Sequence, residues 1–158
     1  MSIEVGERIP DATLFHRSDE GVRAVPASQV FGGRRVALFA VPGAFTPTCS
    51  DTHLPGYVMH ASELLAKVDA IVCLSINDAH VMHAWSRSNH ADAIEMYSDG
   101  NGELTRAMGL TQDLSGTGLG VRSRRYAALV EDGVLRRLWL EPGRGVSVSG
   151  AEAVLAAL

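Results

Sequence analysis

Short apolar runs, separated by segments of helical periodicity, constrain the fold of this chain more than any other feature. Four runs are long enough for one buried strand and too short for a helix, and most are bounded by Gly, Pro, Asn or Asp. They cover residues 35–41, 70–76, 126–131 and 134–140. The last two flank Asp132-Gly133, a pair typical of hairpin turns, so we expect them to run antiparallel.

Helical spacing lies between these runs. Apolar side chains recur at steps of three and four across residues 49–68, where Pro55 is expected to bend or break the helix near its start. Further helices are expected at residues 78–90, 102–108 and 149–158. The first of these three begins beside Asn77 and Asp78, either of which is a suitable helix cap.

Weaker patterns predict a strand at residues 94–97 and the start of an N-terminal hairpin at 12–16. Two glycine-rich stretches, 115–120 and 142–145, are interpreted as surface connections rather than linkers between domains. Alternating strands and helices that close on a hairpin and a helix predict a layered α/β fold.

The composition favours a single domain over residues 1–158. A chain of 158 residues with 46% hydrophobic residues has enough apolar surface for a core without disulfides or a structural metal. Its net charge of -4 is spread without long runs of one sign, which argues against nucleic acid or an anionic membrane as partner.

The cellular compartment is inferred from the start of the chain and from cysteine usage. Residues 1–10 lack the basic start and apolar stretch of a secretory signal, and no apolar run is long enough to span a bilayer. Only Cys49 and Cys73 are present, too few for a disulfide framework and compatible with a reducing compartment. A cytoplasmic location is therefore expected.

The segment 41–49, Val-Pro-Gly-Ala-Phe-Thr-Pro-Thr-Cys, carries the strongest chemical signal. It joins a predicted buried strand to a helix, so Cys49 falls in the first helical turn, where unpaired N–H groups favour a thiolate. Thr46 is placed to direct its hydroxyl at the same sulfur or at an oxygen bound beside it, and Pro42 stiffens the loop. The alternative is that Cys49 is a small buried hydrophobe and Thr46 a helix cap.

The motif Pro42-x-x-x-Thr46-x-x-Cys49 resembles the active-site signature of the peroxiredoxins. Several segments in the same order resemble the type II, peroxiredoxin-five-like subfamily, so that the resemblance covers nearly the whole chain. These segments are 41–49, 52–56, 73–78, Trp85, 122–126 and Asp132-Gly133.

The resemblance implies a thioredoxin-like fold, with a central mixed sheet flanked by helices, and a thiol peroxidase that needs no cofactor. Its substrates would be hydrogen peroxide and organic hydroperoxides. Cys49 would be the peroxidatic cysteine that becomes a sulfenic acid, Thr46 would orient the peroxide, and Pro42 would shield the sulfur. The family register selects Arg125 as the catalytic arginine, although strand alternation alone does not distinguish it from Arg124.

Three more residues are expected around the substrate. The N–H groups of Cys49 and Gly43 would stabilise charge on the departing oxygen, as an oxyanion hole does. Phe45 is expected at the substrate mouth or at a dimer contact, and His53 beside the site, where it holds loop geometry or is simply structural. Trp85 is expected in the core or at the same mouth.

The reduction of the Cys49 sulfenic acid is expected to differ from that in one branch of the subfamily. Some type II members carry a resolving cysteine after the final strand, but residues 145–149 contain none, so the chain is interpreted as a one-cysteine variant. Cys73 lies within a predicted buried strand and is interpreted as structural. An external thiol, namely glutathione, glutaredoxin or thioredoxin, is the expected reductant.

The remaining expectations concern assembly and metal. The family analogy favours a homodimer packed around the active-site loops. His80 and His83 share a helix face, but a third and fourth ligand are missing from the pattern, so no metal is expected.

Three other functions are compatible with parts of this pattern. A disulfide reductase would need a C-x-x-C pair, and Thr46 stands where the partner cysteine would be. A cysteine hydrolase would depend on a histidine base and on acyl substrates. A noncatalytic redox-sensing, binding or chaperone module of thioredoxin fold is the main alternative. A disabling substitution at Pro42, Thr46, Cys49 or Arg125 would favour it, and none is present.

Overall fold

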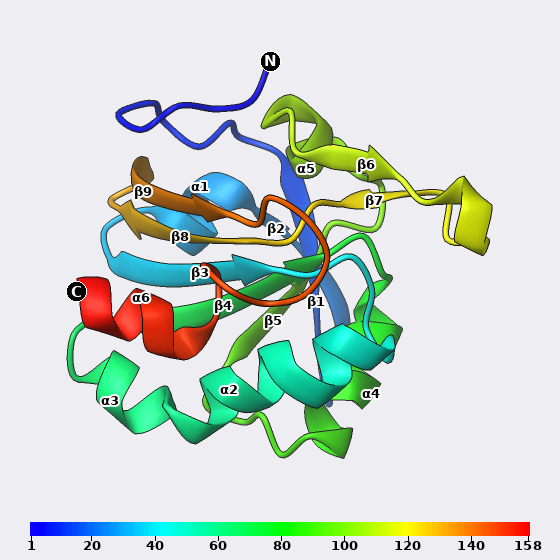
Figure 1. The fold of residues 1–158 in the computed structure, drawn as a ribbon, viewed down its shortest axis with the longest axis horizontal. Helices are drawn as coiled ribbons and strands as arrows, with labels where there is room; N and C mark the ends of the chain where they lie inside the picture. Colours follow the sequence, from blue (N-terminus) through cyan, green and yellow to red (C-terminus); the bar gives the residue numbers. More distant parts are fainter.

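A seven-stranded mixed sheet forms the centre of the computed structural model, which describes residues 1–158 (Figure 1). Its strand order is β2-β1-β5-β4-β3-β8-β9, and β3, β4 and β5 are parallel while the other neighbours are antiparallel. The strands are β1 (Thr13–Ser18), β2 (Gly21–Pro26), β3 (Arg35–Ala40), β4 (Ala70–Ser75), β5 (Glu95–Ser98), β8 (Tyr126–Glu131) and β9 (Val134–Leu140). A separate hairpin pairs β6 (Thr111–Asp113) with β7 (Val121–Ser123).

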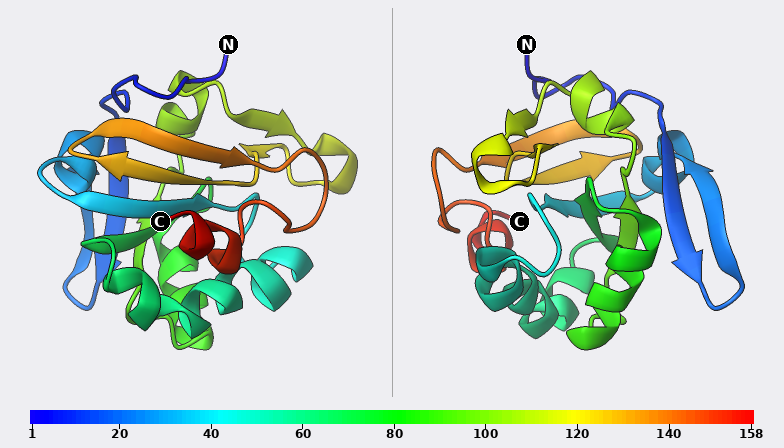
Figure 2. Two further views of the ribbon diagram at one scale, coloured as in Figure 1. Left: turned by 60° about the vertical axis from the view of Figure 1, so that its left-hand side comes forward. Right: turned by 90° about the vertical axis from the view of Figure 1, so that its right-hand side faces the viewer.

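Helices cover both faces of this sheet (Figures 1 and 2). The helices and helical turns are α1 (Ala27–Phe31), the π-helical turn η1 (Cys49–His53), α2 (Leu54–Met59), α3 (Ala61–Leu65), α4 (Ala79–Ser88), α5 (Glu103–Ala107), the 3-10 turn η2 (Ser115–Thr117) and α6 (Ala151–Ala157). Side chains of α1 and α5 belong to one buried cluster, and those of α2, α3, α4 and α6 to another. The sheet therefore has a hydrophobic core on each face.

The alternation of the central strands explains the two cores. Along β3, Leu38 points into one cluster and its neighbour Phe39 into the other, because successive strand residues face opposite sides. All six residues of β4 are buried, as expected for a parallel strand covered on both faces. Cys73 lies at the centre of β4, paired with Phe39 of β3 and with Met96 of β5.

Most of the predicted elements are present. The four strong strands, the final hairpin and the N-terminal hairpin are confirmed, and the weaker strand lies one residue later than expected, at β5. Helix α4 is capped by Asp78, whose carboxylate accepts a hydrogen bond from the Val81 N–H at 2.9 Å, whereas Asn77 serves another purpose described below. The thioredoxin-like α/β architecture expected from the sequence is confirmed.

The long helix predicted over residues 49–68 is divided into three pieces. It starts as the π-helical turn η1, and Pro55 stands in the first turn of α2, where a missing N–H is tolerated. A second break, at His60, separates α2 from α3 and was not predicted. Helix α1 and the β6–β7 hairpin were also not predicted, and the glycine-rich stretch 115–120 forms the exposed tip of that hairpin.

The helices are short. The longest, α4, has 10 residues, and none is long and apolar enough to cross a membrane.

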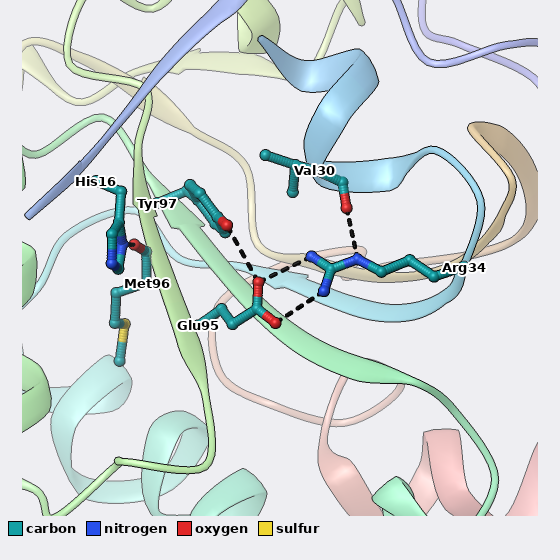
Figure 3. Close-up of polar contacts among 6 residues, drawn as sticks. All are labelled: His16, Val30, Arg34, Glu95, Met96 and Tyr97. Atoms are coloured by element: carbon teal, nitrogen blue, oxygen red, sulfur yellow. Dashed lines mark hydrogen bonds and ion pairs between the residues drawn. The ribbon is translucent and has the colours of Figure 1, made fainter. Parts of the chain in front are cut away.

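A polar cluster next to α1 joins the segment before β3 to the start of β5. Figure 3 shows the Arg34 guanidinium in a two-pronged contact with the Glu95 carboxylate, with N–O distances of 2.8 and 2.9 Å. The same guanidinium donates through Nε to the Val30 carbonyl at 2.8 Å, and the Tyr97 hydroxyl donates to Glu95 at 3.1 Å. The ion pair thus joins the segment before β3 to β5, across the intervening β4.

We expect this ion pair to contribute less than about 1 kcal/mol at neutral pH, because both side chains are partly open to water. Burial disfavours the ionised Glu95, but the bonds from Arg34 outweigh it and lower the pKa of Glu95. The unfolded chain therefore takes up this proton first, and the contribution is lost as the pH falls below the ordinary glutamate range. A double-mutant cycle of Arg34→Gln and Glu95→Gln by chemical denaturation measures it. A coupling energy unchanged in strong acid would contradict the ionic origin.

Candidate active site

Cys49 lies at the point where the loop after β3 turns into helix. It is the first residue of the π-helical turn η1, and its side chain has no solvent exposure. The loop that leads to it, 41–48, leaves the carboxyl end of β3, and the Val41 N–H still bonds to the Leu74 carbonyl of β4 at 3.1 Å. The Cys49 sulfur is thereby held against the core rather than on a free loop.

Arg125 is the arginine that reaches this sulfur. It lies immediately before β8, is 9% exposed, and its Nη2 donates to the Cys49 Sγ at 3.1 Å. Its Nη1 lies 2.8 Å from Nδ1 of His53. Because an arginine carries a permanent positive charge, this contact places a fixed charge beside the sulfur. By contrast, Arg122 reaches the Pro42 carbonyl at 3.5 Å, and the Arg124 side chain lies at the wall of a cleft.

The hydrogen bonds of His53 determine its tautomer. Since Arg125 can only donate, Nδ1 must be the acceptor, and the proton resides on Nε2, which donates to the Ser149 carbonyl at 3.0 Å. Burial, with a smaller contribution from the Arg125 charge, lowers the pKa of His53 to about 4. The ring is thus neutral at physiological pH and supports the guanidinium without repelling it.

A buried carboxylate stands behind Ser149. Glu141 is 4% exposed and accepts four hydrogen bonds, from the N–H and hydroxyl of Ser147 and of Ser149, at 2.6 to 2.9 Å. Burial alone would raise the pKa of Glu141, but these bonds prevail and lower it to about 2. The Ser149 carbonyl also accepts from the Tyr57 hydroxyl at 2.8 Å. A continuous chain of contacts therefore runs from Glu141 through Ser149, His53 and Arg125 to Cys49.

Sequence reasoning did not find Glu141 and Ser149. Ser149 is the first residue of a predicted helix, and Glu141 lies between a predicted strand and a stretch interpreted as a connection; His53 and Ser149 are 96 positions apart in the chain. The one local signal is Glu141 at the end of a strand, followed by serines at 147 and 149 that offer hydroxyl and N–H donors.

The loop before Cys49 is fixed by its own hydrogen bonds. The Thr46 hydroxyl donates to the Gly43 carbonyl at 2.6 Å rather than to the sulfur. The Ala44 N–H donates to the side-chain oxygen of Asn77 at 2.8 Å, so Asn77 anchors the loop instead of capping α4. A Cβ on Gly43 would lie 3.1 Å from the Thr46 methyl carbon, which leaves little room for any other residue there.

Two aromatic residues near the site are placed differently. Phe45 has a φ of 64°, in the left-handed region that bulky side chains rarely adopt, and is 54% exposed. Trp85 is fully buried, and its indole N–H donates to the Ser50 hydroxyl at 3.0 Å, which braces the turn that begins at Cys49. Of the two expectations for Trp85, the core position is therefore confirmed.

Cys73 is a buried free thiol. Burial, reinforced by the charge on nearby Cys49, raises the pKa of Cys73 well above its ordinary value. A neutral thiol in the middle of β4 is a poor nucleophile, so the structural interpretation of Cys73 agrees with its surroundings.

An open cleft of about 400 Å³ adjoins the site. The active-site loop contributes Pro42 and Thr48, and Arg125 lines the cleft as well. The β6–β7 hairpin and the segment after β9 form its other walls, and Figure 2 shows both beside the active-site loop.

We expect His53 to make the stability of the protein depend on pH between about 6.5 and 4. In that range the unfolded chain binds a proton that the folded chain excludes, so the free energy of unfolding falls as the pH falls. The loss reaches about 3 kcal/mol, because one pKa unit corresponds to about 1.4 kcal/mol. Chemical denaturation of wild type and His53→Gln across this range measures the difference.

Replacing the exposed His80 by glutamine is the matched control, and it should leave the slope against pH nearly unchanged. An equal slope in wild type and His53→Gln would contradict the buried, neutral state of this ring.

Known proteins resemble this chain over nearly its whole length. The family model described as Redoxin matches residues 4–155. The chain is 53% identical over 165 residues to "Peroxiredoxin-2E-2, chloroplastic" of Oryza sativa subsp. japonica, covering 99% of this chain and 73% of that protein.

Solved structures agree with these relatives. Reduced Prx3 of Vibrio vulnificus, in complex with H2O2, superposes with a TM-score of 0.95 at 47% identity, covering 98% of both chains. Peroxiredoxin 5 of Alvinella pompejana gives 0.86 at 34% identity, covering 98% of this chain and 97% of that one. These matches confirm the resemblance expected from the motif around Cys49. The chain therefore belongs to the redoxin family, as a peroxiredoxin with the thioredoxin-like fold and the activity of a thiol-dependent peroxidase.

Proposed function

We propose that Cys49 is the peroxidatic residue of this enzyme and that Arg125, Thr46 and Pro42 complete its catalytic site. The observation that carries the proposal is the contact of 3.1 Å between the Arg125 Nη2 and the Cys49 Sγ, where Cys49 has no solvent exposure and Arg125 is 9% exposed. The substrates are hydrogen peroxide and alkyl hydroperoxides, and the Vibrio vulnificus structure, reduced Prx3 in complex with H2O2, supports this choice.

The chemical step is a displacement at oxygen. The Cys49 thiolate attacks the terminal oxygen of R–O–O–H, the S–O bond forms, and the O–O bond breaks. The thiolate becomes a sulfenic acid, and the departing alkoxide or hydroxide takes a proton from solvent to leave as alcohol or water. Negative charge moves from sulfur to the departing oxygen, and the Arg125 guanidinium, fixed beside the sulfur, stabilises this charge without reorganising.

The loop defines how the peroxide is held. The Thr46 hydroxyl gives its only proton to the Gly43 carbonyl, so its oxygen is left to accept the O–H of the incoming hydroperoxide. The backbone N–H groups of Gly43 and Cys49 are the proposed donors to the peroxide oxygens. The proposed role of Pro42, which lines the adjoining cleft, is to shield the sulfur, and the proposed place of exposed Phe45 is the substrate mouth.

His53 acts through Arg125 in this mechanism. From the sequence, His53 is expected among the substrate-binding residues, where it holds loop geometry or is structural. Its ring is fully buried, and both nitrogens are occupied, by Arg125 and by the Ser149 carbonyl. We therefore assign it a positioning role: it fixes the orientation of the guanidinium that the peroxide meets.

The sulfenic acid is regenerated by an external thiol. Residues 145–149 contain no cysteine, and Cys73 is buried with a raised pKa. The candidate reductants are glutathione, glutaredoxin and thioredoxin, each through a mixed disulfide on Cys49.

Assembly, domain organisation and compartment belong to the same proposal. We propose one domain over residues 1–158, supported by the seven-stranded sheet with a core on each face. A homodimer is supported by Phe45, an exposed aromatic in a strained conformation on the active-site loop. The two free cysteines fit a cytoplasmic location, although the rice relative is named as chloroplastic.

We expect Cys49→Ser to abolish peroxide reduction, because it removes the nucleophile. Cys73→Ser should leave the first oxidation by hydrogen peroxide largely intact, because that thiol is neutral and structural. Stopped-flow oxidation of the reduced proteins by hydrogen peroxide and by a bulky alkyl hydroperoxide measures both and ranks the substrates. Rates no faster than a free cysteine, or loss of the first step in Cys73→Ser, would overturn these assignments.

Arg125→Lys tests the contact between the Arg125 guanidinium and the Cys49 sulfur while it keeps the positive charge. A lysine lacks the planar fork that serves Cys49 and His53 at once, so we expect oxidation by hydrogen peroxide to slow by about 100-fold or more. Arg136→Lys, at an exposed position of β9, is the matched control and should oxidise at the wild-type rate. Wild-type kinetics in Arg125→Lys would show that charge alone suffices.

A further inference from the structure

The cleft beside Cys49 has an unusual charge. Three arginines line it, Arg124, Arg125 and Arg144, against a single acidic residue, Glu141. The Glu141 carboxylate is already saturated by its four bonds from Ser147 and Ser149. The cleft is thus positively charged, in a protein whose net charge is -4.

Two of these arginines have no partner. Arg125 is engaged by Cys49 and His53, but the side chains of Arg124 and Arg144 form neither a hydrogen bond nor an ion pair within the chain. Arg124 comes from the segment before β8 and Arg144 from the segment after β9, so the two guanidiniums reach one cleft from separate elements. Free guanidiniums in a concave site are suited to bind carboxylates.

The rest of the lining indicates what kind of molecule carries those carboxylates. Besides two prolines, Leu114 is the one aliphatic residue among the twelve that line the cleft. The other walls are polar side chains and glycines, which favour a polar molecule and disfavour a hydroperoxide with a long apolar tail. The volume of about 400 Å³ lies within the usual range for small-ligand sites.

The place of the cleft indicates the reaction. Pro42 and Thr48, near the two ends of the loop that leads to Cys49, both line the cleft. Arg125 lines it as well and contacts the Cys49 sulfur. The sulfur itself has no solvent exposure, which hinders the broad surface of a protein thiol more than a slender molecule. A molecule held by Arg124 and Arg144 would therefore lie next to Arg125, which contacts the Cys49 sulfur.

We propose that this cleft is the binding site for the reductant, and that the reductant is a small thiol carrying carboxylates. This inference rests on the proposed role of Cys49 and narrows the choice among external thiols. The thiolate of the bound molecule attacks the sulfur of the Cys49 sulfenic acid, the S–S bond forms and the S–O bond breaks. The departing hydroxide takes a proton and leaves as water. A second thiolate then attacks the mixed disulfide and releases the Cys49 thiolate.

The test compares two thiols of the same shape. Cys49 is first oxidised by one equivalent of hydrogen peroxide, and its reduction is then followed with glutathione and with glutathione dimethyl ester, which lacks both carboxylates. Each rate is divided by the fraction of thiolate present. The variants are Arg124→Gln and Arg144→Gln, with Arg136→Gln as the control for loss of one positive charge elsewhere.

The readout is the rate at which glutathione reduces the oxidised Cys49, divided by the rate with glutathione dimethyl ester. We expect it to be high in wild type and in Arg136→Gln, to fall about three- to tenfold in each cleft variant, and to decrease at high ionic strength. S-methylglutathione, which cannot react, should bind the wild-type protein and shift the amide resonances of Arg124 and Arg144 in NMR spectra.

The same ratio in wild type and in both cleft variants would overturn the proposal. So would efficient reduction by a thioredoxin or glutaredoxin with no response to the carboxylates of the small thiol. The initial oxidation by hydrogen peroxide is recorded in every sample, so a failure of the peroxidase assignment to Cys49 is seen as slow oxidation and is separate from a failure in the cleft.

Discussion

A buried guanidinium that makes two contacts is the interaction on which the site depends. Arg125 donates to the Cys49 sulfur through one nitrogen and to His53 through the other, and it is almost fully removed from water. A charged group in such a place is stable only when its donors are matched. The Cys49 sulfur is one acceptor and the neutral imidazole nitrogen of His53 is the other, so the guanidinium holds both side chains in place.

The neutrality of His53 is itself a product of the fold. A protonated ring would place a second positive charge against Arg125, and burial together with the fixed tautomer prevents this. The tautomer depends on the Ser149 carbonyl, whose position depends on the saturated carboxylate of Glu141. An anion with a pKa of about 2 keeps its hydrogen bonds at any physiological pH, which makes it a dependable support for the segment after β9.

The sequence predicts those parts of the structure whose cause is local. Strand β4 is predicted to be buried because six apolar or small residues follow one another. The last hairpin is predicted because Asp132-Gly133 favours the backbone conformation of a tight hairpin turn. The β6–β7 hairpin was missed because strands of three residues carry no measurable periodicity. Helix α1, with five residues, is likewise too short for helical spacing to be recognised.

The site divides in the same way. Cys49, Thr46 and Pro42 lie in one continuous motif, so they could be identified together, whereas Arg125 needed the family register because neighbouring arginines look alike in sequence. The role of Glu141 could not be predicted, because it exists only once the segment after β9 folds back onto η1 and α2. Contacts between segments some 90 residues apart leave no trace in local composition.

The segment from Arg122 to Arg125 shows how one short stretch of chain can serve several purposes. Arg122 reaches the Pro42 carbonyl, Arg124 lines the cleft, and Arg125 turns inward to the sulfur. Because Arg124 and Arg125 are adjacent residues at the entry to β8, the register that aims one at Cys49 also aims the other at the cleft. A shift that moved Arg125 off the sulfur would therefore rearrange the cleft as well, so under the proposed roles the oxidation of Cys49 and its reduction both depend on the start of a single strand.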